Sequence, residues 1–336
     1  MPRLRSRYVT LLKGGVGALL IGLLIWQARR NDAFAQLAGG ETDWRLLLLG
    51  FGVTCAAVVL TFVRWRMVAA AAGIELSIGE AIRFGALGYA LTFVGPGAVG
   101  GDLYKAVAVA RVRGGQRAAA AATVLVDRVL GLVAMLLTAT VAIAAFVATD
   151  RMPGGAAWLV CQTTVVTTVV AAVGVVLLFV SAPLGDRVAG WLERTEFGGR
   201  AVAPVFRSWK QYQQRPDLLA AATGVSLLVD VLLVVSFYCV AAALPLSAPT
   251  LVEHFFVVPI YLISAALPIT PGGVGVREGV ADLMYQGFGV SPGQGTLIAA
   301  GHSLTMLLAG GVAVVYYLSR RGKPAPADAA AHPAGS

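Results

Sequence analysis

Two pairs of charged residues in this chain each follow a segment rich in proline and glycine. Asp102 and Lys105 come after GPGAVGG, and Arg277 and Glu278 come after TPGGVGV. The planar guanidinium of an arginine donates paired hydrogen bonds to a phosphate, and a lysine supplies a point charge. A glycine backbone lets a head group approach closely, and the start of a helix favours an anion. These residue types in this order therefore point to the binding of an anionic group such as a phosphate.

Three further charged residues lie at or inside apolar segments. Asp127 and Arg128 stand near the start of one such segment, and Asp230 lies in the middle of another, SLLVDVLLVV. Adjacent opposite charges also fit a plainer role, in which they neutralise each other near the membrane. For Asp230 two roles remain open: a structural hydrogen bond or ion pair between helices, or a place on a substrate or proton pathway. The candidate substrate-binding residues are thus Asp102, Lys105, Asp127, Arg128, Asp230, Arg277 and Glu278.

The sequence carries no sign of a metal site or a catalytic group. Cys55, Cys161 and Cys239 all lie in apolar segments without CxxC spacing, so neither a disulfide framework nor a zinc site is indicated. No HExxH metal motif, no GxxxxGK phosphate loop and no nucleophile with partner residues can be assigned. We therefore expect no metal, no cofactor and no ATP hydrolysis.

The composition is that of an integral membrane protein. Hydrophobic residues make up 58% of the chain and charged residues 13%, with a mean hydropathy of +0.79. A soluble domain carries about a quarter charged residues. The net charge of +9 arises from basic residues that lie between long apolar segments. Anionic lipid head groups are therefore the expected partner, and nucleic acid is not, because no nucleic-acid recognition fold is indicated.

Six apolar segments are long enough to cross a bilayer as helices, which takes about 20 apolar residues. They cover residues 9–28, 46–63, 118–148, 157–181, 218–243 and 296–318. Two shorter apolar segments, 81–94 and 254–268, run into the two proline-glycine motifs. The expected fold is an all-α membrane protein with about six full spans and two re-entrant segments broken by proline and glycine.

The basic residues predict the orientation, because cytoplasmic loops carry an excess of lysine and arginine. By this rule both termini, the stretch with Arg64 after the second span, and residues 182–216 face the cytoplasm, while 244–276 faces outward. The segment 182–216 mixes tryptophan and apolar residues with basic ones, which is typical of amphipathic helices on a membrane surface.

The short apolar segments fit this orientation only if they do not cross fully. A full crossing by 81–94 would place the basic residues of 105–117 outside, against the same rule. We therefore expect 81–117 to dip into the membrane from the cytoplasm and to return. The spans on either side of 254–290 place it on the outer side, so we expect this segment to dip in from the outside.

The two motifs also indicate an internal repeat. Pro96 and Pro271 stand 175 positions apart, about half of the 336 residues, and the glycines after them align. The halves, about 9–148 and 157–318, would then lie in the bilayer with opposite orientation, as in many transporters with broken helices. The plainer alternative is two interfacial loops with turn-forming Pro-Gly. The residues expected to break the backbone and admit a head group are Pro96, Gly97, Gly100, Gly101, Pro271, Gly272, Gly273 and Gly275.

Three stretches together carry a family resemblance that covers about residues 10–320. GPGAVGGDLYKA, DRVLGL and PITPGGVGVREG resemble the flippase-like membrane domain of lysylphosphatidylglycerol synthases and its stand-alone relatives. The resemblance implies that the motif residues named above, including Asp127 and Arg128, are the signature positions, although Lys105 stands where an arginine is expected. The soluble aminoacyl-transferring domain of those synthases has no counterpart in the sequence, so we do not expect this chain alone to aminoacylate lipid.

The expected function is that of a lipid flippase in the bacterial inner membrane, which moves an anionic or polyprenyl-linked lipid between leaflets. Residues 1–321 would form one transmembrane domain, and the proline- and alanine-rich residues 322–336 a disordered tail. Two alternatives stay open: a membrane enzyme that transfers a group to or from a lipid carrier, and a scaffold for envelope synthesis. Envelope-synthesis enzymes or a second copy of the chain are possible protein partners.

Overall fold

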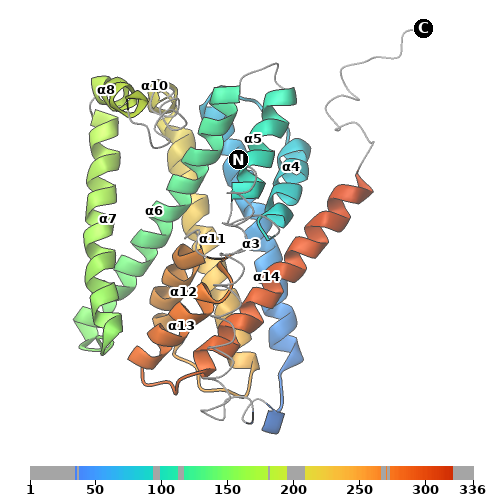
Figure 1. The fold of residues 1–336 in the computed structure, drawn as a ribbon, viewed down its shortest axis with the longest axis vertical. Coiled ribbons are helices and arrows are strands. Elements are labelled where there is room, and N and C mark those ends of the chain that lie inside the picture. The colour runs from blue at the N-terminus through green and yellow to red at the C-terminus, as the bar shows by residue number, and fades with distance from the viewer. Residues whose placement is uncertain are drawn as a thin grey trace, which may run out of the picture.

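All regular structure in the described part of the chain is helical (Figure 1). The structure is a computed structural model that describes residues 38–93, 99–112, 117–180, 182–194, 209–265 and 273–320, with the single positions 35 and 270. Eleven helices lie in these ranges. The all-α class expected from the sequence is confirmed.

Five of these helices are long and apolar enough to cross a membrane. They are α3 (Trp44–Ala71), α6 (Arg117–Thr149), α7 (Ala156–Val180), α11 (Pro216–Ala243) and α14 (Gln294–Ser319). Each coincides with a span expected from the sequence, and α3 extends eight residues beyond the expected end at 63. The expected first span, 9–28, lies outside the described residues.

Two helical hairpins accompany the long helices, at the positions of the two short apolar segments. The first consists of α4 (Ile78–Leu91) and α5 (Val99–Val112), and the second of α12 (Leu251–Ala265) and α13 (Val276–Gly287). The α4–α5 hairpin lies near the end of the molecule where α8 (Ala182–Glu193) and α10 (Trp209–Gln213) are found, whereas α12 and α13 lie toward the opposite end (Figure 1). Both hairpins are too short to cross a bilayer with either helix.

The expected helices within 182–216 are confirmed as α8 and α10. On α8 the side chains of Arg187 and Trp191 are exposed, which suits a helix on a membrane surface. Attachment of α8 to the membrane stays a prediction.

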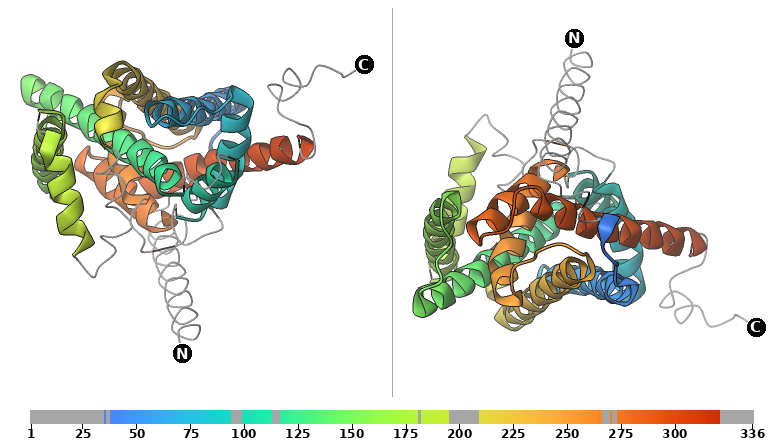
Figure 2. Two further views of the ribbon diagram at one scale, coloured as in Figure 1. Left: turned by 90° about the horizontal axis from the view of Figure 1, so that it is seen from above. Right: turned by 90° about the horizontal axis from the view of Figure 1, so that it is seen from below.

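The helices α3 and α11 form the most extensively packed pair and lie side by side in both views of Figure 2. Gly50 allows the close approach, since a Cβ there would lie 3.1 Å from the Ser236 carbonyl oxygen. The Ser236 hydroxyl donates to the Gly50 carbonyl oxygen at 2.8 Å and lies 2.6 Å from the Thr54 hydroxyl. In a membrane the lipid is as apolar as the helix surfaces, so helices are held together by the close approach that small residues allow and by hydrogen bonds from hydroxyl groups.

Candidate functional site

The second proline-glycine motif forms a sharp entry into α13. Gly273 and Gly275 have φ angles of +71° and +85°, a region that L side chains rarely adopt. A Cβ at Gly273 would also lie 2.6 Å from the Ala265 Cα, so glycine is required there for space as well. The Gly275 N–H donates to the Glu278 Oε2 atom at 2.7 Å, which caps the first turn. Pro271 and Gly272 lie outside the described residues.

Arg277 and Glu278 form a buried ion pair just after this entry. The Arg277 Nε atom lies 3.0 Å from the Glu278 Oε1 atom, and the two residues are 4% and 5% exposed. Ser303 of α14 donates a short hydrogen bond to the same carboxylate, and the Tyr261 hydroxyl lies 2.9 Å from Ser303. The carboxylate is thus held by three donors. Within the described residues the hydrogen bond of Arg277 runs through its Nε atom, and its guanidinium carbon lies 5.7 Å from the centroid of the Tyr261 ring.

The glycines of the first motif have a different place. Gly100 and Gly101 lie in the first turn of α5, and a Cβ at Gly101 would clash with the Gly88 carbonyl oxygen of α4. Gly101 therefore lets the two helices of the hairpin touch backbone to backbone. Pro96 and Gly97 lie outside the described residues.

Lys105 of α5 is a buried cation without a carboxylate partner among the described residues. The residue is 8% exposed, and its Nζ atom lies over the Trp65 ring at 5.2 Å from the centroid. Its stem fits against Gly88, where a Cβ would lie 2.9 Å from the Lys105 Cγ atom. Within the described ranges no hydrogen bond or ion pair involves the Lys105 ammonium. An ammonium in this setting needs an anion or water to satisfy its donors.

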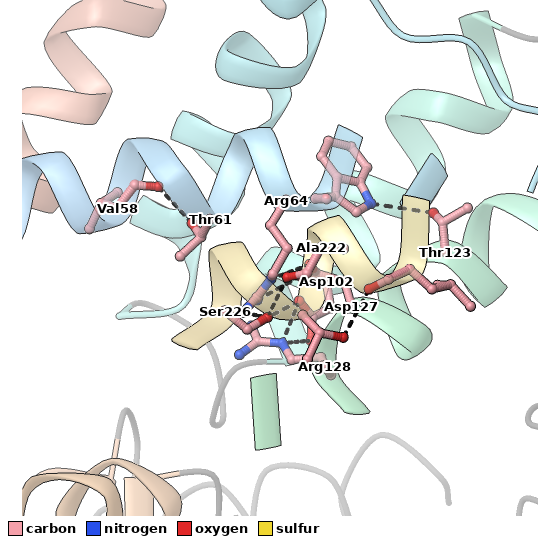
Figure 3. Close-up of polar contacts among 12 residues, drawn as sticks. Val58, Thr61, Arg64, Asp102, Thr123, Asp127, Arg128, Ala222 and Ser226 are labelled. Carbon is pink, nitrogen blue, oxygen red and sulfur yellow. Dashed lines mark hydrogen bonds and ion pairs between the residues drawn. The ribbon is translucent and has the colours of Figure 1, made fainter. Parts of the chain in front are cut away.

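Arg128 of α6 lies beside the same hairpin. Its Nε and Nη2 atoms both contact the Asp102 carboxylate of α5 at 2.9 Å (Figure 3). The two side chains are 45% and 24% exposed, so this pair stays in contact with the surroundings of the bundle. Arg128 is therefore an accessible cation within electrostatic range of Lys105, and Asp102 orients it.

Asp127, next to Arg128 in sequence, pairs with a different arginine. The Arg64 guanidinium of α3 donates to both Asp127 oxygens, at 2.8 and 3.2 Å, and to the Ser226 hydroxyl of α11 at 3.2 Å (Figure 3). Gly131 leaves room for this guanidinium, since a Cβ there would lie 3.1 Å from an Arg64 Nη atom. Arg64 lies within α3, one residue past the expected end of the span at 63, and the cytoplasmic orientation of this end stays a prediction. Arg64 is buried inside the bundle because Asp127 neutralises it there.

Asp230 lies deep in the bundle on α11 and is 2% exposed. Its one hydrogen bond is a long one, 3.4 Å from the Thr138 hydroxyl of α6. Arg64 is within electrostatic range of Asp230 as well as of Asp127, although it is bonded to Asp127 alone. Within the described ranges, Asp230 is therefore a buried carboxyl group without a directly bonded cation.

The first hairpin contacts α14 through α4, and α14 in turn packs against α13 of the second hairpin. The Tyr89 hydroxyl of α4 donates to the Met306 carbonyl oxygen of α14 at 3.2 Å, and Tyr89 is within electrostatic range of Arg277. Phe93 packs on Gly310, where a Cβ would lie 3.2 Å from the ring. These contacts connect the part of the molecule that holds Lys105 with the part that holds Arg277.

Several residues of the two clusters were not singled out from the sequence. Trp65 carries no signal of its own, because an aromatic residue in an apolar helix is common, and Ser303 carries only the weak signal of a hydroxyl residue beside His302 and Thr305. Arg64 did carry a signal, since it interrupts an otherwise apolar helix. Asp282 caps α14 from a neighbouring helix, accepting from Gly293 N at 2.8 Å and Thr296 N at 3.1 Å. The described part of the chain contains no cluster of residues suited to a metal ion.

Long apolar helices with buried ion pairs define a multi-pass helical membrane protein. The profile of the family described as the lysylphosphatidylglycerol synthase TM region matches residues 10–325. The chain belongs to this family, as the three motifs suggested. No curated protein matches the chain.

Proposed function

We propose that this protein moves an anionic lipid, such as a phospholipid or a polyprenyl-linked phosphate, between the two leaflets of the bacterial inner membrane. The observation that carries the proposal is Lys105, a cation that is 8% exposed and has no carboxylate bonded to it among the described residues. An unpaired charge in the interior costs on the order of several kcal/mol. A lipid phosphate that binds there and leaves again accounts for its presence.

The two hairpins give this lipid a route. In our proposal α4–α5 and α12–α13 are re-entrant, dip in from opposite faces and belong to inverted repeats. Their positions toward opposite ends of the molecule support this arrangement (Figure 1). The lipid tails stay in the surrounding bilayer while the head group passes between helices.

Three cations then act in order. Arg128, half-exposed and oriented by Asp102, attracts the phosphate, and Lys105 receives it inside the bundle. Arg277, whose hydrogen bond to Glu278 runs through its Nε atom, holds it in the other half. Rocking of the halves about the α4–α14 contact would alternate access between the leaflets.

Reconstituted vesicles test the proposal. Fluorescent NBD-phosphatidylglycerol is built into both leaflets, and the membrane-impermeant reductant dithionite quenches the label it can reach. We expect vesicles with the protein to lose the signal of both leaflets, and empty vesicles to keep that of the inner one. NBD-phosphatidylcholine, which has no net charge, serves as the matched probe and is expected to exchange more slowly.

The alternatives predict other results in the same experiment. Chromatography of the extracted lipids would reveal a chemically altered probe if the protein were a membrane enzyme. If the vesicles contain folded protein but the probe is neither exchanged nor modified, the proposal is contradicted. The scaffold for envelope synthesis then remains.

A further inference from the structure

Four buried charged residues from three long helices and the first hairpin form one electrostatic set. Arg64 of α3, Lys105 of α5, Asp127 of α6 and Asp230 of α11 are 7%, 8%, 4% and 2% exposed. Lys105 is within electrostatic range of Asp127, Arg64 and the more exposed pair Arg128–Asp102, whose two charges cancel, and Arg64 is within range of Asp230. Arg64 and Asp127 are bonded to each other through two contacts, which leaves Lys105 and Asp230 as the members without a bonded counter-ion in the described part of the chain.

The charge of this set decides how an anion can enter it. Without a ligand the set is neutral, whether Lys105 is charged and Asp230 ionised or Lys105 has passed its proton to Asp230. A phosphodiester adds one negative charge. In a water-poor interior an uncompensated charge is costly, so the bound set regains neutrality only when one more proton is taken up.

We propose that Asp230 is the proton-binding member of the Lys105 anion site, so that a lipid phosphodiester and a proton bind to this protein together. With the proton on Asp230, Lys105 stays charged and faces the phosphate, and Arg64 stays on Asp127. The proton leaves when the lipid leaves. This proposal rests on the proposed lipid transport and adds the form of its coupling.

The surroundings of Asp230 leave few other groups for this role. Helix α11 packs against α3, α6, α10, α12 and α14, and α10 contributes the buried Tyr212, which is within electrostatic range of Asp127. The charged neighbour of Asp230 on α3 is Arg64. Helix α6 contributes the neutral Thr138, which is bonded to Asp230, and Asp127, which is bonded to Arg64. From α12 and α14 the titratable groups near α11 are His254 and His302, which contact Phe237 about two helical turns from Asp230. Phe237 is an apolar spacer, so neither histidine is bonded to the four-residue set.

The structure also separates Asp230 from the other buried carboxyl groups. Glu278 accepts hydrogen bonds from Gly275, Arg277 and Ser303, and Asp282 accepts from Gly293, Thr296 and Gln286. Each of these two carboxylates accepts three hydrogen bonds, so a change at either one disturbs a network. Asp230 has the one long contact with Thr138, and so gains and loses a proton without breaking a network.

Calorimetry of the purified full chain in detergent tests the proposal. Dihexanoyl phosphatidylglycerol is titrated into the protein in two buffers of different ionisation enthalpy, which yields the number of protons taken up per lipid. We expect about one proton per lipid within the pH range where Asp230 titrates, and an affinity that falls by about tenfold per pH unit above it. Dihexanoyl phosphatidylcholine, the neutral control lipid, is expected to cause no uptake.

Two variants test whether Asp230 is the group that takes up the proton. Asp230→Asn is expected to bind the anionic lipid with no proton uptake, whereas Asp217→Asn, an exposed carboxylate on the same helix, keeps the wild-type value. If Asp230→Asn does not fold, Thr138→Val replaces it: the lost hydroxyl donor should move the pH midpoint of the uptake upward. Lipid binding without proton uptake in the wild type, uptake that persists in Asp230→Asn, or an unmoved midpoint in Thr138→Val would each overturn this inference alone. A wild type that binds no anionic lipid would contradict the proposed function itself.

Discussion

At the scale of single residues, Lys105 allows a test of whether its charge stabilises the fold or serves to bind a ligand. Its stem packs on Gly88, and its ammonium lies over the Trp65 ring without a bonded carboxylate within the described ranges. Lys105→Met keeps an unbranched side chain of similar length and removes the charge. We expect the variant to have an apparent melting temperature in detergent equal to or above that of the wild type, because the ammonium has no bonded counter-ion and Asp230 keeps the set neutral by binding a proton. A fall of the melting temperature would show that the charge serves the fold.

The Arg64–Asp127 pair should behave in the opposite way. Both side chains are buried, and the guanidinium makes two contacts with the carboxylate. Arg64→Met strands a buried carboxylate and is expected to cost about 3–5 kcal/mol. The double variant Arg64→Met/Asp127→Leu should recover much of this loss, because neither partner is then left alone. Thermal unfolding of all three proteins in one detergent measures the coupling, and equal losses in the single and double variants would contradict it.

Arg277 offers a test of geometry rather than charge. Its Nε atom holds Glu278, while Gly275 and Ser303 hold that carboxylate independently. Arg277→Lys keeps the charge but loses the planar fork. We therefore expect exchange of a phosphate-bearing lipid in vesicles to fall by roughly tenfold or more, with little change in melting temperature. Wild-type exchange by Arg277→Lys would show that the fork is not used.

At the scale of helices, Gly101 is the contact on which the first hairpin depends. A Cβ there would clash with a backbone oxygen of Gly88, and backbone cannot move aside as a flexible side chain does. Gly101→Ala is expected to destabilise the protein by about 1–3 kcal/mol through overpacking. Gly52→Ala on α3 is the matched control, since no atom lies within 4 Å of the place its methyl group would take, and it should be neutral or slightly stabilising. Equal effects of the two changes in thermal unfolding would contradict the close packing of α4 on α5.

The helices themselves could be predicted from the sequence much better than the contacts between them. Long apolar runs and Pro-Gly breaks predicted six spans, five of which lie in the described residues and are confirmed, and the positions of both hairpins, because each signal is local. The pairing of charges is not local. Asp127 and Arg128 are adjacent and looked like a self-neutralising pair, yet neighbours on a helix point about 100° apart. Asp127 therefore reaches Arg64 on α3, and Arg128 reaches Asp102 on α5.

The burial of Arg64 could not be predicted from the sequence either. Counted along the sequence, this arginine belongs with the basic residues that follow a span. Its burial depends on the carboxylate 63 positions later, and no pattern within α3 indicates that partner. The candidate residues could thus be found from the sequence, whereas their partners required the packed bundle.

At the scale of the whole molecule, the orientation in the membrane can be tested directly. In a background without Cys55, Cys161 and Cys239, single cysteines replace exposed residues at the two ends of the bundle: Arg111, Arg151, Arg187 and Ser247. A membrane-impermeant maleimide applied to intact spheroplasts should label positions 151 and 247. Positions 111 and 187 should react only after lysis, because their segments face the cytoplasm. Labelling of position 111 from outside would contradict the re-entrant first hairpin.

The most direct test of the central claim compares lipid exchange by the wild type and by Lys105→Met in vesicles, with Gly52→Ala as the control. NBD-phosphatidylglycerol and dithionite report exchange, and the amount of folded protein is matched by detergent extraction and thermal unfolding. We predict rapid exchange by the wild type and by Gly52→Ala, and exchange close to that of empty vesicles for a well-folded Lys105→Met. Wild-type exchange by Lys105→Met would contradict the claim that the buried ammonium binds the lipid phosphate.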